Sequence, residues 1–302
     1  MPTYEFVTVD VFTDRRFGGN PLAVFPAADG LSDADMQALA AEFNLSETTF
    51  VLRPDVPRHS ARVRIFGPRS ELPFAGHPNV GTGFVLARRM DNPPEHFTFE
   101  ELAGLVRVHV LRGPDGTVDG ARISAPRSLT RGSAVPTETV AACAGLDPED
   151  IATGAHTPLI ASVGMPFVIA EVTDLAALGR AAPDPAAFRA AQPAFAQEAA
   201  RFPLYLYVRV DGSALRLRTR MFAPLGGIME DPATGSASAT LAALLTAEAP
   251  GEDVALTFEI EQGVEFGRPS RIVAAARKTG EGPVSATVSG TCVPMLAGTV
   301  TL

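Results

Sequence analysis

The chain has 302 residues, of which 46% are hydrophobic and 20% are charged, a composition typical of a globular protein with an ample core. Its formal net charge is −9 and it has no basic cluster, so we expect neither a nucleic acid nor a membrane as a partner. The start of the chain lacks the basic and apolar regions of a secretory signal, and the most apolar stretch, 158–172, is too short to span a bilayer. We therefore expect a cytoplasmic protein.

The first part of the chain is predicted to contain runs of strands interrupted by two helices. The first helix, over 31–44, has Ser32 as its N-cap and apolar residues at helical spacing. The second, over 79–90, is apolar and ends in basic residues, which suit the negative end of the helix dipole. The predicted strands lie at 6–12, 22–25, 48–52 and 61–66, with several more between 97 and 125.

The segment 126–136 is rich in Pro, Ser, Thr and Gly, so we predict a connector between two domains there. The elements that follow repeat the order of the first part: strands, side helices, strands, a central helix and more strands. They are predicted as helices at 138–143, 175–200 (a pair) and 235–247, and as strands at 159–172, 204–210, 216–222, 254–275 and 284–302.

The similar order of elements indicates a weak internal duplication. Both central helices are apolar almost all round, as expected of a helix enclosed by a sheet. Because strands follow strands in runs, a doubly wound parallel sheet is disfavoured. We predict an α+β fold with a helix inside a curled, mostly antiparallel sheet in each half.

Two segments of small residues, 75–81 and 231–237, begin these central helices. Small first-turn residues leave the free backbone N–H groups uncovered, and such amides bind anions. The glycines at 76–83 do not form a nucleotide loop. No Lys-Ser/Thr follows Gly76 and Gly81, and Gly81-Thr82-Gly83 lacks the third glycine of the dinucleotide fingerprint and lies inside the predicted helix. We therefore expect two lobes that close on one small acidic substrate.

His77 lies in the first of these segments and Asp231 in the second. His77 either neighbours a helix cap or binds a ligand anion beside the open amides, where the positive helix end favours a neutral imidazole. Asp231 either caps a short turn with Pro232 in its first position or belongs to the site. Glu230 is expected to be a solvated neighbour.

Glu47 lies between a predicted helix end and an apolar strand. A carboxylate at this point either sits at the rim of the sheet or is buried. Burial raises a carboxyl pKa and makes the group a proton carrier near neutral pH.

Other reactive side chains give no sign of function. Lys278 is the only lysine and lies near a predicted turn, so we expect it at the surface, which excludes Schiff-base chemistry. Cys143 and Cys292 have no metal or redox spacing and are expected to be buried and unreactive. The remaining histidines lack the spacing of metal ligands, so no metal is expected.

Five motifs together resemble the phenazine-biosynthesis isomerase (PhzF-like) family, within the diaminopimelate epimerase-like superfamily. They lie at 17–21 (FGGNP), 44–48 (NLSET), 71–78 (ELPFAGHP), 230–237 (EDPATGSA) and 261–263 (EQG), and the resemblance covers nearly the whole chain. It implies two pseudo-symmetric lobes, 1–128 with 288–302 and 129–287, a site in the cleft between the helix starts, and a homodimer.

The resemblance also implies the chemistry. Glu47 is expected to move a proton within a small, cyclic, amino- or hydroxy-substituted carboxylate, without a cofactor. His77 and Asp231 are expected to assist it as catalytic residues. The residues expected to bind the substrate are Asn20, Ser46, Gly76, Pro78, Thr234, Gly235 and Ser236.

The chain departs from the epimerase branch at its two thiols. Aligned without gaps, Ala75 and Pro232 stand where that branch has cysteines, and Ala223 and Pro224 stand where it has a glutamate and an arginine. Two-thiol racemisation is therefore excluded, and one carboxylate must serve as the base. Two alternatives stay open: a noncatalytic metabolite-binding protein, and a racemase or epimerase that uses Glu47 and Asp231 as opposed bases.

Overall fold

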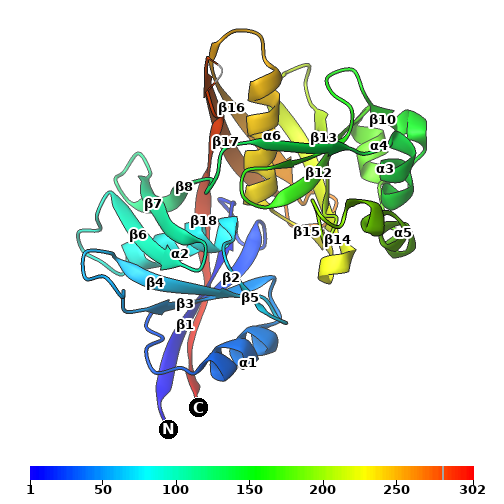
Figure 1. The fold of residues 1–302 in the computed structure, drawn as a ribbon. Coiled ribbons are helices and arrows are strands. Elements are labelled where there is room, and N and C mark those ends of the chain that lie inside the picture. Colours follow the sequence, from blue (N-terminus) through cyan, green and yellow to red (C-terminus); the bar gives the residue numbers. More distant parts are fainter. Residues whose placement is uncertain (281) are drawn as a thin grey trace. The chain divides into compact units, whose positions relative to one another are not determined.

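The computed structural model describes residues 1–280 and 282–302, which form two compact units (Figure 1). The first unit comprises Met1–Ser124 and Ser289–Leu302, and the second comprises Ala125–Val288. Each unit has a mostly antiparallel sheet around one central helix, so the predicted α+β fold class is confirmed. Among the described residues, no helix combines the length and the apolar character needed to cross a bilayer.

The first unit is a closed eight-stranded barrel. Its strands follow one another in the order β1, β2, β3, β4, β6, β7, β8 and β18, and β18 pairs with β1 to close the ring. Figure 1 shows β1 and β18 side by side, with both termini at their ends. The elements are β1 (Thr3–Val11), β2 (Asn20–Phe25), α1 (Asp33–Phe43), β3 (Glu47–Leu52), β4 (Ala61–Phe66), β5 (Glu71–Leu72), α2 (Gly76–Arg88), β6 (His96–Glu101), β7 (Gly104–Arg112), β8 (Val118–Ser124) and β18 (Ser285–Thr301).

Helix α2 fills the barrel, and all its residues except Leu86 and Arg88 are buried. Its glycines permit this close fit. A Cβ on Gly81 would lie 2.6 Å from Cδ2 of Leu22, and one on Gly83 would lie 2.5 Å from Cγ1 of Val108. These glycines therefore allow the helix to pack closely against the sheet. This packing explains why the helix is rich in glycine although it forms no nucleotide-binding loop.

We expect Gly83→Ala to destabilise the protein by about 1–3 kcal/mol, because the added methyl group overpacks the barrel against Val108. Gly179→Ala is the matched control, since Gly179 is also helical and no atom lies within 4 Å of its would-be Cβ. Alanine's helix propensity makes this control neutral or stabilising by up to about 1 kcal/mol. Urea unfolding of both variants measures the difference, and equal stability of the two would contradict the packing role.

Helix α1 lies outside the barrel and sets the start of β3. Ser32 caps it as predicted, in a reciprocal capping box with Asp35, and Asn44 ends it in the left-handed conformation with φ 49°. Phe43 packs on the ring of Phe6 with centroids 4.9 Å apart. These contacts anchor the short connection that delivers Glu47 to the first position of β3.

The second unit contains the remaining elements. They are β9 (Thr130–Ala134), α3 (Thr137–Ala144), β10 (Ile151–Ala152), β11 (Leu159–Ser162), β12 (Pro166–Val172), α4 (Leu175–Arg180), α5 (Pro185–Phe195), β13 (Leu204–Arg209), β14 (Arg216–Ala223), β15 (Ile228–Asp231), α6 (Gly235–Glu248), β16 (Asp253–Gln262) and β17 (Ser270–Thr279), with single 3-10 turns at Pro148–Asp150 and Pro224–Gly226.

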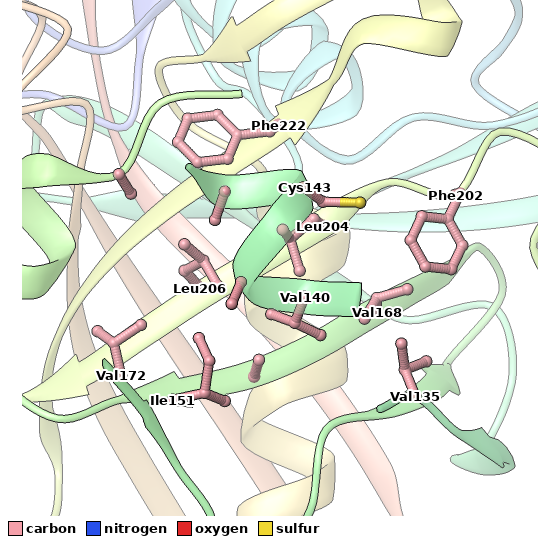
Figure 2. Close-up of a cluster of buried hydrophobic side chains, with 14 of the residues drawn as sticks. Val135, Val140, Cys143, Ile151, Val168, Val172, Phe202, Leu204, Leu206 and Phe222 are labelled. Atoms are coloured by element: carbon pink, nitrogen blue, oxygen red, sulfur yellow. The ribbon is translucent and has the colours of Figure 1, made fainter. Parts of the chain in front are cut away.

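Two layers of helix cover the sheet of the second unit. Figure 2 shows Val140 and Cys143 of α3 packed among Leu204 and Leu206 of β13 and Phe222 of β14. Alternate residues of β13 face the other way, toward the central helix α6, which is almost entirely buried. The burial of Cys143 raises its pKa to about 12, which agrees with an unreactive thiol.

The two units repeat one strand-pairing pattern. In the first unit, the pairs β1–β2, β3–β4, β4–β5 and β6–β7 are antiparallel, and β2–β3 and β4–β6 are parallel. In the second unit, the corresponding pairs β11–β12, β13–β14, β14–β15 and β16–β17 are antiparallel, and β12–β13 and β14–β16 are parallel. The central helices α2 and α6 occupy the same place in the two series, after β5 and after β15. The predicted internal duplication is therefore seen in the order and direction of the strand pairs.

Three local predictions were wrong. The segment 126–136 is not a plain connector, because it contains β9, which pairs with β11. Helix α2 begins at Gly76 rather than at residue 79, because enclosure in the barrel overrides the poor helix propensity of its first residues. Lys278 is half-buried rather than a free surface group, and its Nζ donates to the carbonyl oxygens of Ala247 (3.1 Å) and Ala249 (2.5 Å) at the end of α6.

Candidate active site

In the first unit, Glu47 and His77 lie side by side. Glu47 is the first residue of β3, His77 lies in the first turn of α2, and Nε2 of His77 is 3.3 Å from Oε2 of Glu47. The side chains are 14% and 6% exposed, respectively. A carboxyl group thus meets an imidazole in a nearly water-free place within one unit.

His77 is neutral at physiological pH. Burial lowers its pKa to about 3, because desolvation disfavours the charged imidazolium. The sequence predicted a neutral imidazole from the helix end, but the physical cause in the structure is burial. A neutral ring forms no ion pair with Glu47, and Nε2 of His77 has no hydrogen-bond partner among the described residues although it lies 3.3 Å from Oε2 of Glu47.

Asn20 begins strand β2, and Ser46 directly precedes Glu47 at the start of the neighbouring strand β3. The hydroxyl of Ser46 donates to Oδ1 of the buried Asn20 at 3.1 Å, and the parallel pairing of β2 with β3 sets Leu22 opposite Glu47. The turn between β1 and β2, which leads into Asn20, is held in place by close contacts. The amide of Phe17 donates to Asp10 (2.8 Å), and a Cβ on Gly19, at φ +63°, would lie 2.3 Å from the carbonyl oxygen of Val11.

The start of α2 is free of any side chain that would cap it. Ala75 occupies the N-cap position and makes no side-chain cap hydrogen bond, and the first turn contains no acidic residue. Pro78 has no N–H group, so the amides of Gly76 and His77 are the donors that this helix start offers. Such amides, at the positive end of the helix dipole, suit a carboxylate.

In the second unit, Asp231 is held at the start of α6. It ends β15, and Oδ2 accepts a hydrogen bond from the hydroxyl of Thr234 at 2.5 Å. Thr234 is at the N-cap position, where its side chain makes no cap bond, and Gly235 and half-buried Ser236 follow in the first turn. Asp231, Thr234, Gly235 and Ser236 thus gather at one helix start, as the sequence predicted.

Gln262 organises this second group, although no role was predicted for it. Its Nε2 donates to the carbonyl oxygen of Asp231 (2.8 Å) and to Oγ1 of Thr234 (3.0 Å), and its Oε1 accepts from the amide of Thr234 (3.0 Å). The next residue, Gly263, has φ +73°, and a Cβ there would lie 2.5 Å from the carbonyl oxygen of Pro232. The motif EQG at 261–263 was therefore the sequence feature that could have indicated the role of Gln262.

Tyr205 extends the same network into the core. Its hydroxyl pairs with Ser238 at 2.8 Å and donates to Thr219 at 3.0 Å, and Ser238 in turn donates to the carbonyl oxygen of Thr234 at 3.0 Å. All of these groups are buried, so they fix the helix start rather than react.

Glu230 is not a solvated neighbour, so that prediction was wrong. It forms a two-pronged ion pair with Arg220, at 2.8 Å and 2.7 Å, and the side chains are only 11% and 8% exposed. Nη1 of Arg220 also donates to the carbonyl oxygens of Leu178 (3.0 Å) and Ala181 (2.5 Å). This buried pair ties β15, and with it Asp231, to β14 and to the end of α4.

Each unit therefore gathers polar groups at one helix start. The first has a carboxyl group, a neutral imidazole and two open amides, which together can carry out acid/base chemistry on an anion. The second has a carboxylate, hydroxyl groups and an open helix start, which can bind polar groups. No three His, Cys, Asp or Glu side chains cluster as metal ligands within residues 1–280 and 282–302.

Comparison with known proteins gives consistent matches over almost the whole chain. The family model described as phenazine biosynthesis-like protein matches residues 9–298. An uncharacterized isomerase of Mesorhizobium japonicum is 40% identical over 99% of both chains. A trans-2,3-dihydro-3-hydroxyanthranilate isomerase of Pseudomonas aeruginosa is 36% identical over 95% of both. In fold, a Bacillus anthracis protein described as phenazine biosynthesis protein, PhzF family, superimposes with a TM-score of 0.85 at 24% identity, over 100% of both chains.

Proposed function

The chain belongs to the phenazine biosynthesis-like protein family and is an isomerase, and from this premise we propose that it moves a proton within a small cyclic carboxylate without a cofactor. The observation that carries the proposal is the contact of 3.3 Å between Glu47 and neutral His77 at the open start of α2. One base and one anion site within a single unit are the parts that such a shift requires.

Glu47 acts as the proton carrier. As a carboxylate it takes a proton from one ring carbon while the C–H bonding electrons shift the double bonds. As a carboxylic acid it then returns a proton to another carbon on the same face, which restores the carboxylate. His77, being neutral, lies beside Glu47, offers Nε2 to the substrate and does not compete for the proton.

The remaining groups bind the substrate. The amides of Gly76 and His77, with Pro78 closing the turn, take a carboxylate, while Asn20 and Ser46 orient Glu47. We assign Asp231 to an amino or hydroxyl group of the substrate, with binding support from Thr234, Gly235 and Ser236.

The names of the relatives support one substrate class. Three of them, 35–36% identical to this chain, are called trans-2,3-dihydro-3-hydroxyanthranilate isomerase. This compound is a cyclic amino-hydroxy carboxylate, and it contains each group that the two helix starts suit. We therefore propose it, or a close analogue, as the substrate.

Purified protein incubated with trans-2,3-dihydro-3-hydroxyanthranilate tests the function. We expect loss of the substrate's ultraviolet absorbance with turnover, and a product of equal mass in which a ring hydrogen has moved. Binding without turnover, across related cyclic amino and hydroxy acids, would instead indicate a noncatalytic binding protein. Inversion at one carbon, with the bonding unchanged, would indicate a racemase that uses Glu47 and Asp231.

The family resemblance also predicts a homodimer. Light scattering would then give twice the chain mass of 31.6 kDa. A mass equal to one chain would contradict this part of the proposal.

A further inference from the structure

Gln262 is fully buried at the end of β16, and its side-chain amide has one possible orientation. The backbone N–H group of Thr234 can only donate, so Oε1 of Gln262 must face it, and the two heavy atoms are 3.0 Å apart. The carbonyl oxygen of Asp231 can only accept, so Nε2 of Gln262 must face that oxygen, at 2.8 Å. Two backbone groups of fixed polarity thus agree on how this amide is turned.

This orientation also sets the direction of the hydroxyl proton of Thr234. Nε2 of Gln262 donates its second hydrogen to Oγ1 of Thr234 at 3.0 Å, so the hydroxyl group is an acceptor on that side. Its own proton is directed to Oδ2 of Asp231, at 2.5 Å. A hydrogen bond donated to a carboxylate favours the ionised form. The donors therefore run in one direction, from Gln262 through Thr234 to Asp231.

The backbone around Gln262 is held by a second contact. Gln262 pairs with Ser270 across β16 and β17, and the hydroxyl of Ser270 donates to the carbonyl oxygen of Pro232 at 2.9 Å. Gln262 and Ser270 are at most 1% exposed. Because Gln262 is enclosed in this way, it can act on a substrate only through Thr234 and Asp231.

We propose that Gln262 is a positioning residue, which through the hydroxyl of Thr234 holds Asp231 as an acceptor for an amino or hydroxyl group of the substrate. The inference rests on the proposed function, in which Asp231 binds such a group. It adds that Asp231 enters the reaction as a carboxylate and gives the substrate no proton, so that proton return falls to Glu47. A ligand that lacks the donor group leaves this acceptor without its partner and binds more weakly.

Calorimetric titration with three aromatic carboxylates tests the inference. They are 3-hydroxyanthranilate, anthranilate, which lacks the hydroxyl group, and 3-hydroxybenzoate, which lacks the amino group. The wild type should bind the analogue that lacks the group at Asp231 about 10–100-fold more weakly than 3-hydroxyanthranilate, because a hydrogen bond to a charged acceptor is lost. Gln262→Met should reduce that preference to about threefold or less, since Thr234 then has no donor that directs its proton to Asp231. The analogue whose deficit depends on Gln262 identifies the group that Asp231 takes.

Gln262→Glu gives a comparison that a purely structural role would not affect. When ionised, at high pH, the introduced carboxyl group cannot donate to Thr234, so the preference should be lost. When protonated, it can donate again, so the preference should return as the pH is lowered, and Gln262→Met should show no such recovery. Gln192→Met is the matched control, because Gln192 of the same unit donates to the carbonyl oxygen of Ala200 at 3.0 Å, away from Asp231, and it should keep the wild-type preference.

Neutron diffraction from ligand-free crystals of the wild type separates this inference from the proposed function. Deuterium should lie on Oγ1 of Thr234 and point to Asp231, and the carboxyl group of Asp231 should carry none. If this is found but no cyclic carboxylate binds or turns over, the proposed function alone fails. Deuterium on Asp231 that points to Thr234, or a wild-type preference that Gln262→Met and ionised Gln262→Glu both keep, would overturn the role of Gln262.

Discussion

Glu47→Gln is expected to lower kcat by at least about 10²–10⁴-fold, because glutamine has the size of glutamate but cannot carry a proton. The Ser46–Asn20 hydrogen bond and the start of α2 do not depend on the charge of Glu47, so fold and ligand binding should persist. Steady-state kinetics with trans-2,3-dihydro-3-hydroxyanthranilate measure the loss. Fluorescence titration with 3-hydroxyanthranilate, a stable aromatic analogue, measures binding.

Glu42→Gln is the matched control, because Glu42 is exposed on α1 and lies outside the site. Its kcat should equal that of the wild type. If Glu47→Gln keeps kcat within a few-fold of the wild type, another group moves the proton. If it loses analogue binding as well as kcat, Glu47 holds the substrate rather than carrying its hydrogen.

Glu230→Leu is expected to cost about 3–5 kcal/mol of unfolding free energy, because it strands the buried guanidinium of Arg220. The same change should lower kcat/KM, since the ion pair fixes β15 and therefore Asp231. Urea unfolding measures the first effect and steady-state kinetics measure the second.

Glu248→Leu provides the comparison for this pair. Glu248 binds Arg131 in the same unit, but the side chains are 40% and 44% exposed, so its loss should cost no more than about 1 kcal/mol. Equal losses of stability in the two variants would show that burial does not distinguish these ion pairs.

Local patterns in the sequence predict most of the fold. Periodicity and the Ser32 cap place α1, and a long run of small apolar residues places α6 at Gly235–Glu248. The start of α2 was predicted three residues late, because Gly76 and Pro78 are poor helix formers when judged alone. The barrel around them supplies burial that no local pattern contains.

The candidate site was likewise predicted only in part from local patterns. Glu47 and His77 were found from their motifs, and the structure places them in contact across thirty residues of sequence. Gln262 was missed because its role depends on partners that only the fold brings near. Glu230 was assigned to solvent for the same reason, since Arg220 reaches it across the β14–β15 pair.

The most direct test of the central claim follows ring hydrogens by NMR while wild type and Glu47→Gln act on trans-2,3-dihydro-3-hydroxyanthranilate in heavy water. The wild type should remove hydrogen from one ring carbon and place hydrogen or deuterium on another. Glu47→Gln should produce neither isomerisation nor exchange over the same period. Exchange that continues in Glu47→Gln at a rate near that of the wild type would contradict the account.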